Sequence, residues 1–355
     1  MSNRVPGMVK KLTEAGFTHA LIHKRQNMFY LTGYTGEGCL FVGPEGAVIL
    51  TDFRYTEQAE RQAPGCRIIR TGAGVRPYEE CAKMLAAAGA KTLAIETDFV
   101  TVDGEKAIAA AMEGVTLKPL GHVIDEMRIL KDADEIAAIE EACRISCKAF
   151  EHMLGVIHAG MTEKQVQVEL DYTMLRLGAD GLSFDTIACA GVNGSLPHAI
   201  PSDHVIEKGE LLTMDFGALY HGYHADMTRT IAIGEVSAQL EEIYYTVLEA
   251  QKKALDMLHE GVVLSDVDKC ARDFLEAKYP GAFGHSLGHG VGLDIHEQPG
   301  LSMRDHRTLA VGHVVTIEPG VYLPGVGGCR IEDMGVLTEN GFKNMIFAPK
   351  ELIRV

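Results

Sequence analysis

The chain has 355 residues, which is long enough for two domains. Hydrophobic residues make up 46% of it and charged residues 23%, an ordinary balance for a globular protein. The formal net charge of −16 argues against nucleic acid or an anionic membrane surface as a partner. No apolar run approaches the roughly 18 residues of a membrane-spanning helix, so no membrane partner is expected either.

The eight cysteines are scattered along the chain without the spacing of a metal site. Cys143 and Cys147 are four apart in a predicted helix, but two helical thiols alone do not make a zinc site. We therefore expect reduced thiols, which suit a cytoplasmic protein.

The first third of the chain, residues 1–125, alternates short apolar runs with helical stretches. This pattern predicts a small α/β domain with a mixed or parallel sheet. The strands are expected at 20–23, 39–42, 47–51, 67–70 and 92–96, and the helices at 55–61, 77–88 and 102–111.

A charged stretch, DEMRILKDAD, separates this domain from the rest and is the expected hinge. We assign 126–134 to the linker and 135–355 to a second domain. The second domain opens with a long helix predicted from about Ala133 to Ile157. A further helix begins at Thr162, which can form a capping box with Gln165, and runs to Leu177.

A weak internal echo follows these helices. The sequence IHAG at 157–160 recurs as LHEG at 258–261, and the Glu-Glu pair at 140–141 recurs at 241–242 with the same offset. An echo this short can arise by chance, but it is also what two similar halves of one domain would leave.

Between the repeated helices, 211–216 and 225–233 are predicted to form a hairpin around 220–223. The hairpin places Asp215 and Asp226 on adjacent antiparallel strands. Cβ atoms of cross-strand pairs lie roughly 5 Å apart, so the two carboxylates would repel each other unless a cation lay between them.

Potential metal ligands stand in apolar, strand-like segments from Leu211 to Met334. An unpaired carboxylate in such surroundings would lose its charge or cost much free energy. Each carboxylate has a polar residue two positions away, on the same face of a strand, while the residues between are apolar. Read singly, each could be a structural acid or a core histidine, but together they indicate a cation site. The five are Asp215, Asp226, His289, Glu318 and Glu332.

Four carboxylates and one imidazole form a hard, oxygen-rich ligand set. Such a set suits Mn²⁺ best, with Co²⁺, Fe²⁺ or Zn²⁺ as substitutes. Two such ions could share a water molecule and lower its pKa, which makes hydroxide available near neutral pH.

Several sequence blocks resemble one family in order and spacing. DFGALYHGYHADMTRT, GHGVGLDIHEQPG, TIEPGVY and RIEDMGVLT are similar to the signature blocks of the metal-dependent Xaa-Pro peptidases, prolidase and aminopeptidase P. SFDTIACAG and SLPHAI extend the resemblance upstream. NMFYLTGYTG and TDFRYTEQA are similar to the creatinase-type N-terminal domain. The resemblance implies an α+β chain, in which a smaller N-terminal α/β domain precedes a C-terminal pita-bread domain shared with creatinase and methionine aminopeptidase.

The resemblance also implies a role for each site residue. Asp226 and Glu332 would bridge two divalent ions, Asp215 would complete one site, and His289 with Glu318 would complete the other. The resemblance also implies that two histidines outside the ligand set contact the substrate carbonyl or the scissile amide. Those histidines are His198 and His296. Arg330 lies two residues from Glu332, and we expect it to orient the carboxylate cluster through a charge-assisted hydrogen bond.

Other readings of the same segments are weaker. Residues 284–288 match the G-x-S-x-G nucleophile elbow around Ser286, but the Gly- and Pro-rich sequence that follows does not predict the helix that an elbow needs. The glycines at 288, 290 and 292 lack dinucleotide-loop spacing, and we expect them to let the backbone pass close to the metal centre. Creatinase shares the fold but lacks the metal ligands, whereas this chain has all five, so a creatinase activity is not expected.

Two alternatives stay open, a methionine-aminopeptidase-like activity and a non-catalytic pita-bread binding module. Methionine aminopeptidase has a different context around its last glutamate, and a binding module would be expected to have lost ligands.

We therefore predict a cytoplasmic metallopeptidase that uses a hydroxide activated by two metal ions to cleave the bond before proline. Its substrate would be a small peptide with proline at the second position. The resemblance further implies a homodimer. Dipeptidase and aminopeptidase P specificities both remain open, as do the native metal and the preferred first residue.

Overall fold

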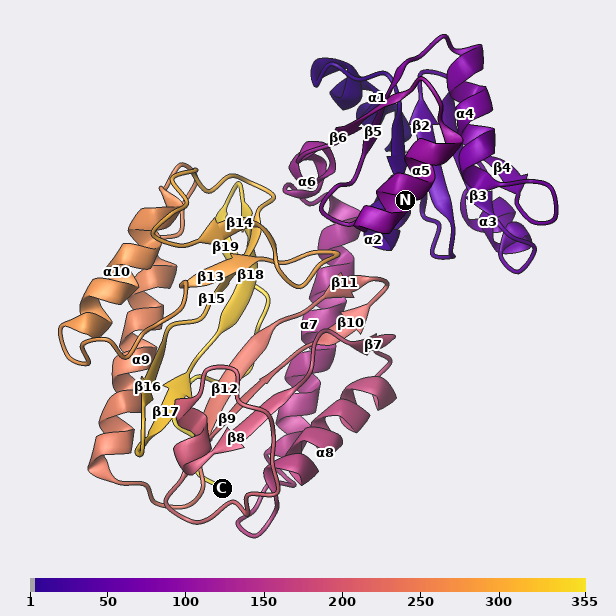
Figure 1. Cartoon of the computed structure of the whole chain (residues 1–355). Helices are drawn as coiled ribbons and strands as arrows, with labels where there is room; N and C mark the ends of the chain where they lie inside the picture. The colour runs from indigo at the N-terminus through magenta and orange to yellow at the C-terminus, as the bar shows by residue number, and fades with distance from the viewer. Residues whose placement is uncertain (1–3) are drawn as a thin grey trace. The chain divides into compact units, whose positions relative to one another are not determined.

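The computed structural model describes residues 4–355 (Figure 1). The chain divides into two compact units, one ending at Arg128 and the other beginning at Ile129. No helix within the described residues is both long and apolar enough to cross a membrane.

The first unit is built on a mixed six-stranded sheet in the order β4-β3-β2-β1-β5-β6. The central β1, β2 and β3 are antiparallel neighbours, whereas β4, β5 and β6 each pair in parallel. The strands are β1 (Ala20–Ile22), β2 (Cys39–Gly43), β3 (Gly46–Thr51), β4 (Arg67–Arg70), β5 (Thr92–Ile95) and β6 (Thr116–Pro119).

Helices pack against this sheet around a core that includes Leu21, Leu93 and Ile108. They are α1 (Val5–Glu14), α2 (Arg25–Thr32), α3 (Thr56–Gln62), α4 (Pro77–Ala87), α5 (Val102–Ala111) and α6 (Val123–Arg128). The five predicted strands and three predicted helices are confirmed with small shifts at their ends.

The prediction missed α1, α2, β6 and α6. Helix α6 occupies the first residues of the expected hinge, and the division between the two units falls within that stretch. Arg128 of α6 is buried and donates a hydrogen bond of 2.8 Å to Oδ1 of Asn27, so tertiary contacts fix this short helix.

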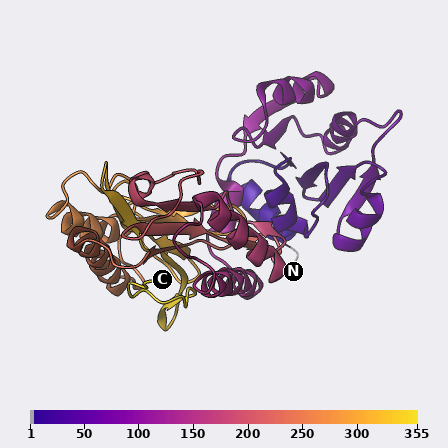
Figure 2. The same ribbon diagram turned by 90° about the horizontal axis from the view of Figure 1, so that it is seen from below.

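The second unit consists of two halves with the same order of elements. The first half contains α7 (Ala133–Met153), α8 (Glu163–Arg176) and a sheet in the order β12-β9-β8. The second half contains α9 (Ala238–Asp256), α10 (Leu264–Glu276) and β13, β15 and β18 within the sheet β14-β13-β15-β18-β19. Figures 1 and 2 show the strands lying between the two helix pairs.

The strands of the first half are β7 (Gly181–Leu182), β8 (Ile187–Ala190), β9 (Leu211–Phe216), β10 (Ala218–Tyr220), β11 (Tyr223–His224) and β12 (Met227–Ala232). Those of the second half are β13 (Gly288–Gly290), β14 (Glu297–Leu301), β15 (Val314–Ile317), β16 (Gly320–Leu323), β17 (Gly327–Arg330), β18 (Asp333–Thr338) and β19 (Gly341–Asn344). A short 3₁₀ helix, Gly191–Ser195, follows β8.

The sequence echo corresponds to this structural repeat. In both halves, the glycine that ends the echo donates a backbone hydrogen bond to a later segment. Gly160 donates to Ile206 at 2.9 Å, and Gly261 donates to Leu309 at 2.8 Å. The predicted capping box of Thr162 and Gln165 is confirmed at the start of α8. Helix α7 ends at Met153, four residues before the predicted end.

Candidate metal centre and active site

The polar stripe predicted along the first pair of strands is present, with one correction. β9 and β12 are antiparallel neighbours, and Asp215 lies directly opposite Thr228. The prediction that Asp215 and Asp226 form a direct cross-strand pair is therefore wrong. Asp226 precedes β12 and is a diagonal neighbour of Asp215, which is still within reach across a twisted pair of strands.

The second half contributes its acids at matching places. Glu318 follows β15 and Glu332 precedes β18, while Asp215 is the last residue but one of β9 and Asp226 precedes β12. The residues between the polar positions are fully buried on the apolar face, as expected. They are Met214, Met227, Ile317 and Ile331.

His289, in the middle of β13, lies among these carboxylates. Its Nε2 is 3.4 Å from Oδ2 of Asp226 and 3.4 Å from Oε1 of Glu318. Its Nδ1 lies 3.0 Å from the backbone oxygen of Gly290, which leaves Nε2 to face the acids. One atom each of Asp226, His289 and Glu332 lies within 4.8 Å of the others, a spacing that fits one ion.

The free oxygens of the cluster point to a cation. Among residues 4–355, Oδ1 of Asp215, Oδ1 of Asp226 and Oε1 of Glu332 are buried without a hydrogen-bond partner. Burial, followed by repulsion from neighbouring carboxylates, raises the pKa of Asp226 and of Glu332 well above its usual range. Burial also raises the pKa of Glu318. Buried acids with unused oxygens are what a divalent cation would satisfy, so the residues fit the expected metals.

Arg330 ties the cluster together from β17. It is buried, and its guanidinium donates to Oδ2 of Asp215 at 2.5 Å and to Oγ1 of Thr228 at 3.1 Å. Thr228 in turn donates to Oε2 of Glu332 at 2.7 Å. Each of these two carboxylates therefore has one oxygen held and the other free.

The structure brings all eight predicted site residues to one cavity of about 510 Å³. His198 enters from the loop after the 3₁₀ helix, and His296 from the residue before β14. The rings of His289 and His296 meet edge to face with centroids 4.3 Å apart. Burial, and then the neighbouring imidazoles of His289 and His198, lower the pKa of His296 to about 4.

Two further residues at this site were missed in the sequence. His285 lines the cavity, and its Nε2 lies 2.9 Å from the hydroxyl of Tyr322. That hydroxyl accepts a hydrogen bond of 2.7 Å from Arg330. Burial, followed by the charge of Arg330, lowers the pKa of His285 to about 4. His285 stands four residues before His289, and Tyr322 stands four residues after Glu318. Their closeness in sequence to predicted ligands is the one feature from which they could have been predicted.

The glycines of β13 serve close strand packing. A Cβ at Gly288 would lie 2.0 Å from the backbone oxygen of Thr316, and one at Gly290 would lie 2.5 Å from that of Gln298. The close approach predicted for them is thus made to neighbouring strands. No helix follows Ser286, so the context of a nucleophile elbow is absent there.

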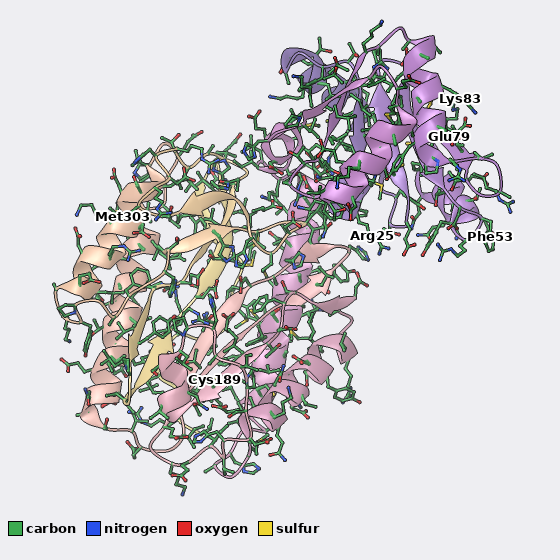
Figure 3. All side chains as sticks on the ribbon, viewed as in Figure 1. Arg25, Phe53, Glu79, Lys83, Cys189 and Met303 are labelled. Carbon is green, nitrogen blue, oxygen red and sulfur yellow. The ribbon has the colours of Figure 1, made fainter. Side chains whose placement is uncertain are left out.

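The cysteines take no part in the site. In the part of the chain that the structure describes, all eight are unpaired, and six are buried. Cys189 of β8, labelled in Figure 3, lies among the strands of the second unit.

Two family models match the chain. The model of metallopeptidase family M24 matches residues 137–339, and that of the creatinase/prolidase N-terminal domain matches residues 4–130. An uncharacterized peptidase of Bacillus subtilis is 41% identical, with 96% of each chain covered. A Xaa-Pro dipeptidase of Pyrococcus horikoshii is 36% identical, with 99% of each chain covered.

Solved structures agree over the whole chain. A Xaa-Pro dipeptidase from Bacillus anthracis matches with a TM-score of 0.95 and 39% identity, covering 99% of each chain. An X-Pro aminopeptidase from Thermotoga maritima matches with a TM-score of 0.90 and 36% identity, covering 98% of this chain and all of that one. The predicted fold class, a creatinase-type α/β unit followed by a pita-bread unit, is confirmed.

Proposed function

This chain belongs to metallopeptidase family M24, and we propose that it hydrolyses the peptide bond before proline in small peptides. The observation that carries the proposal is that the four predicted carboxylates, the three predicted histidines and Arg330 meet in one cavity. Relatives named as Xaa-Pro dipeptidases and as an X-Pro aminopeptidase support the choice of proline as the second residue.

We propose that five side chains hold two divalent ions, with Asp226 and Glu332 shared between them. The oxygen-rich ligand set favours Mn²⁺ over thiolate-preferring ions. When bound, the ions would supply a water molecule of lowered pKa next to the substrate. The other three ligands are Asp215, His289 and Glu318.

The chain's own residues orient this centre and the substrate. Arg330 and Thr228 each hold one carboxylate oxygen, of Asp215 and of Glu332, which leaves the second oxygen of each acid for a metal ion. His296 is neutral at pH 7 because its pKa lies at about 4. A neutral imidazole carries one N–H donor and one acceptor nitrogen, so His296 can donate to the scissile carbonyl oxygen. His198 lines the same cavity, and its proposed role is to hold the proline amide.

The test is hydrolysis of Ala-Pro beside Ala-Pro-Ala by chelator-stripped protein with and without Mn²⁺. Metal-dependent cleavage of either peptide supports the proposal, and the preferred length distinguishes a dipeptidase from an aminopeptidase. If neither peptide is cut under any divalent ion, the proposal is wrong. Cleavage of Met-Ala-Ala instead would favour the methionine-aminopeptidase alternative.

Two further features belong to the proposal. The unpaired, mostly buried thiols favour a reducing compartment, and we place the protein in the cytoplasm. The homodimer expected from the family stays a prediction, which light scattering of the purified chain would check.

A further inference from the structure

A buried ion pair lies beside the candidate active site and has no part in the proposed chemistry. Nζ of Lys131 is 2.7 Å from Oε1 of Glu297, and the two side chains are only 1% and 10% exposed. Lys131 precedes α7, and its backbone N–H donates to Gly312 at 2.9 Å. Glu297 lines the cavity next to His296.

Both oxygens of Glu297 have partners. Oε1 faces Lys131, and Oε2 accepts a hydrogen bond of 3.3 Å from the backbone of Asp294. The backbone at Gly292 also passes directly against this carboxylate, since a Cβ there would lie 2.4 Å from Oε1. Glu297 is thus clamped in place, and its contacts suit an anchor better than a proton acceptor.

The anchor acts on the segment that carries His296. Glu297 is the first residue of β14 and lies opposite Gly290 of β13. His296 is one peptide bond before Glu297, and His289 is one before Gly290. The two histidine rings are in contact, with centroids 4.3 Å apart. Holding Glu297 in place therefore holds the backbone next to it, and with it the orientation of the His296 side chain.

We propose that Lys131 is a positioning residue, which holds His296 against the metal centre through its ion pair with Glu297. This inference rests on the proposed peptidase function. Removing one member of a buried pair leaves the other charge uncompensated, so the anchored segment would shift to rehydrate it. A displacement near 1 Å at a positioned group can cost about 100-fold in rate.

The experiment compares Lys131→Met, Glu297→Gln, the double variant and Lys131→Arg, all as full-length, Mn²⁺-loaded protein. On whichever proline peptide the wild type cleaves, each neutralising single variant should lower kcat about 100-fold. KM and bound metal should change little. The double variant should be no worse than either single variant, because the two residues act as one unit. Lys131→Arg should recover most of the activity.

A second comparison asks whether Lys131 acts through His296. Adding Lys131→Met to a His296→Ala background should lower kcat by no more than about twofold, since the group being positioned is already gone. Leu170→Ala, which opens a cavity in the buried face of α8, is the control for general loss of stability. It should lower the melting temperature while kcat stays near that of the wild type.

Three results would overturn the inference: wild-type kcat in Lys131→Met, loss of bound metal along with activity, or a full additional loss in the His296→Ala background. If Lys131→Met does not fold, the isosteric Glu297→Gln variant and its own combination with His296→Ala decide the matter. A wild type that cleaves no proline peptide would instead refute the proposed function, so the two failures are distinguishable.

Discussion

Arg330 shows how much one side chain determines at this site. Its guanidinium donates hydrogen bonds to Asp215 and Thr228. It also donates a hydrogen bond of 3.2 Å to the backbone oxygen of Pro197, one residue before His198. The buried guanidinium of Arg330 therefore contacts both Asp215, a proposed metal ligand, and the loop that carries His198, a proposed substrate contact. The sequence predicted the first role from proximity to Glu332, but the contact to Pro197 could not be foreseen.

At Glu332 we expect a single truncation to remove metal and activity together. Glu332 is 1% exposed, and one of its oxygens has no partner within residues 4–355. Glu332→Ala should lower kcat/KM by more than about 100-fold, because even outer partners of metal ligands cost 10–100-fold. Metal content after dialysis, measured by atomic emission, should fall in parallel. Retained metal and activity would exclude the bridging role.

His313 should make stability depend on pH. Burial, followed by the charges of Lys131 and Arg307, lowers its pKa to about 4. A lowered histidine pKa means that the unfolded chain binds the extra proton first, so stability is lost as pH falls from about 6.5 towards 4. Its Nδ1 accepts a hydrogen bond of 3.1 Å from Ala310.

His313→Asn keeps an acceptor at that place and removes the titration. Urea unfolding at pH 7.5 and pH 5 should show the wild type losing about 2 kcal/mol more than the variant. An equal loss in the two proteins would show that His313 does not carry this dependence.

At the scale of elements, the ends of the repeated helices are set by local chemistry. Thr162 and Gln165 cap the first turn of α8 reciprocally, at 3.1 Å and 2.8 Å. Thr162→Ala should lower the free energy of unfolding by about 1 kcal/mol, because a helix N–H loses its acceptor. The neighbouring exposed Lys164→Ala should change it little. Chemical denaturation of both variants provides the measurement, with kcat expected to stay unchanged in each.

What could be predicted follows the range of the interactions involved. The predicted acids lie in short motifs whose period-two pattern is visible locally, and the predicted histidines lie in blocks that resemble one family. The sequence could therefore name eight residues that the structure brings to one cavity. The partner of Lys131 lies in the other half of the unit, and α6 is held by Arg128 through a distant Asn27, so neither had a local signal. The predicted strand included Asp226 because the sequence does not show that two short strands, β10 and β11, lie between β9 and β12.

At the scale of the molecule, the two units have separate hydrophobic cores. The core around Leu21 and Leu93 belongs to the first unit, and the core around Val247 and Val315 belongs to the second. All eight site residues belong to the second unit. We therefore expect calorimetry to resolve two transitions, of which Mn²⁺ raises only one.

At 100 times the dissociation constant, bound Mn²⁺ adds about 2.7 kcal/mol, which would raise the melting temperature of that unit by about 5–10 °C. The other transition is the internal control. Equal shifts of both transitions would contradict this picture and indicate that the units unfold together.

Protein synthesis imposes an order on the metal centre. The hydrogen bond from Thr228 to Glu332 joins residues 104 positions apart, and that from Arg330 to Asp215 joins residues 115 apart. At 5–20 residues per second, a ribosome needs roughly 5–20 s to travel from the first pair of acids to the second. During that interval a nascent chain holds only two or three of the five proposed ligands, so loading with metal belongs to the finished polypeptide. The supply of metal in the cell would then act on completed molecules, after the ribosome has released them.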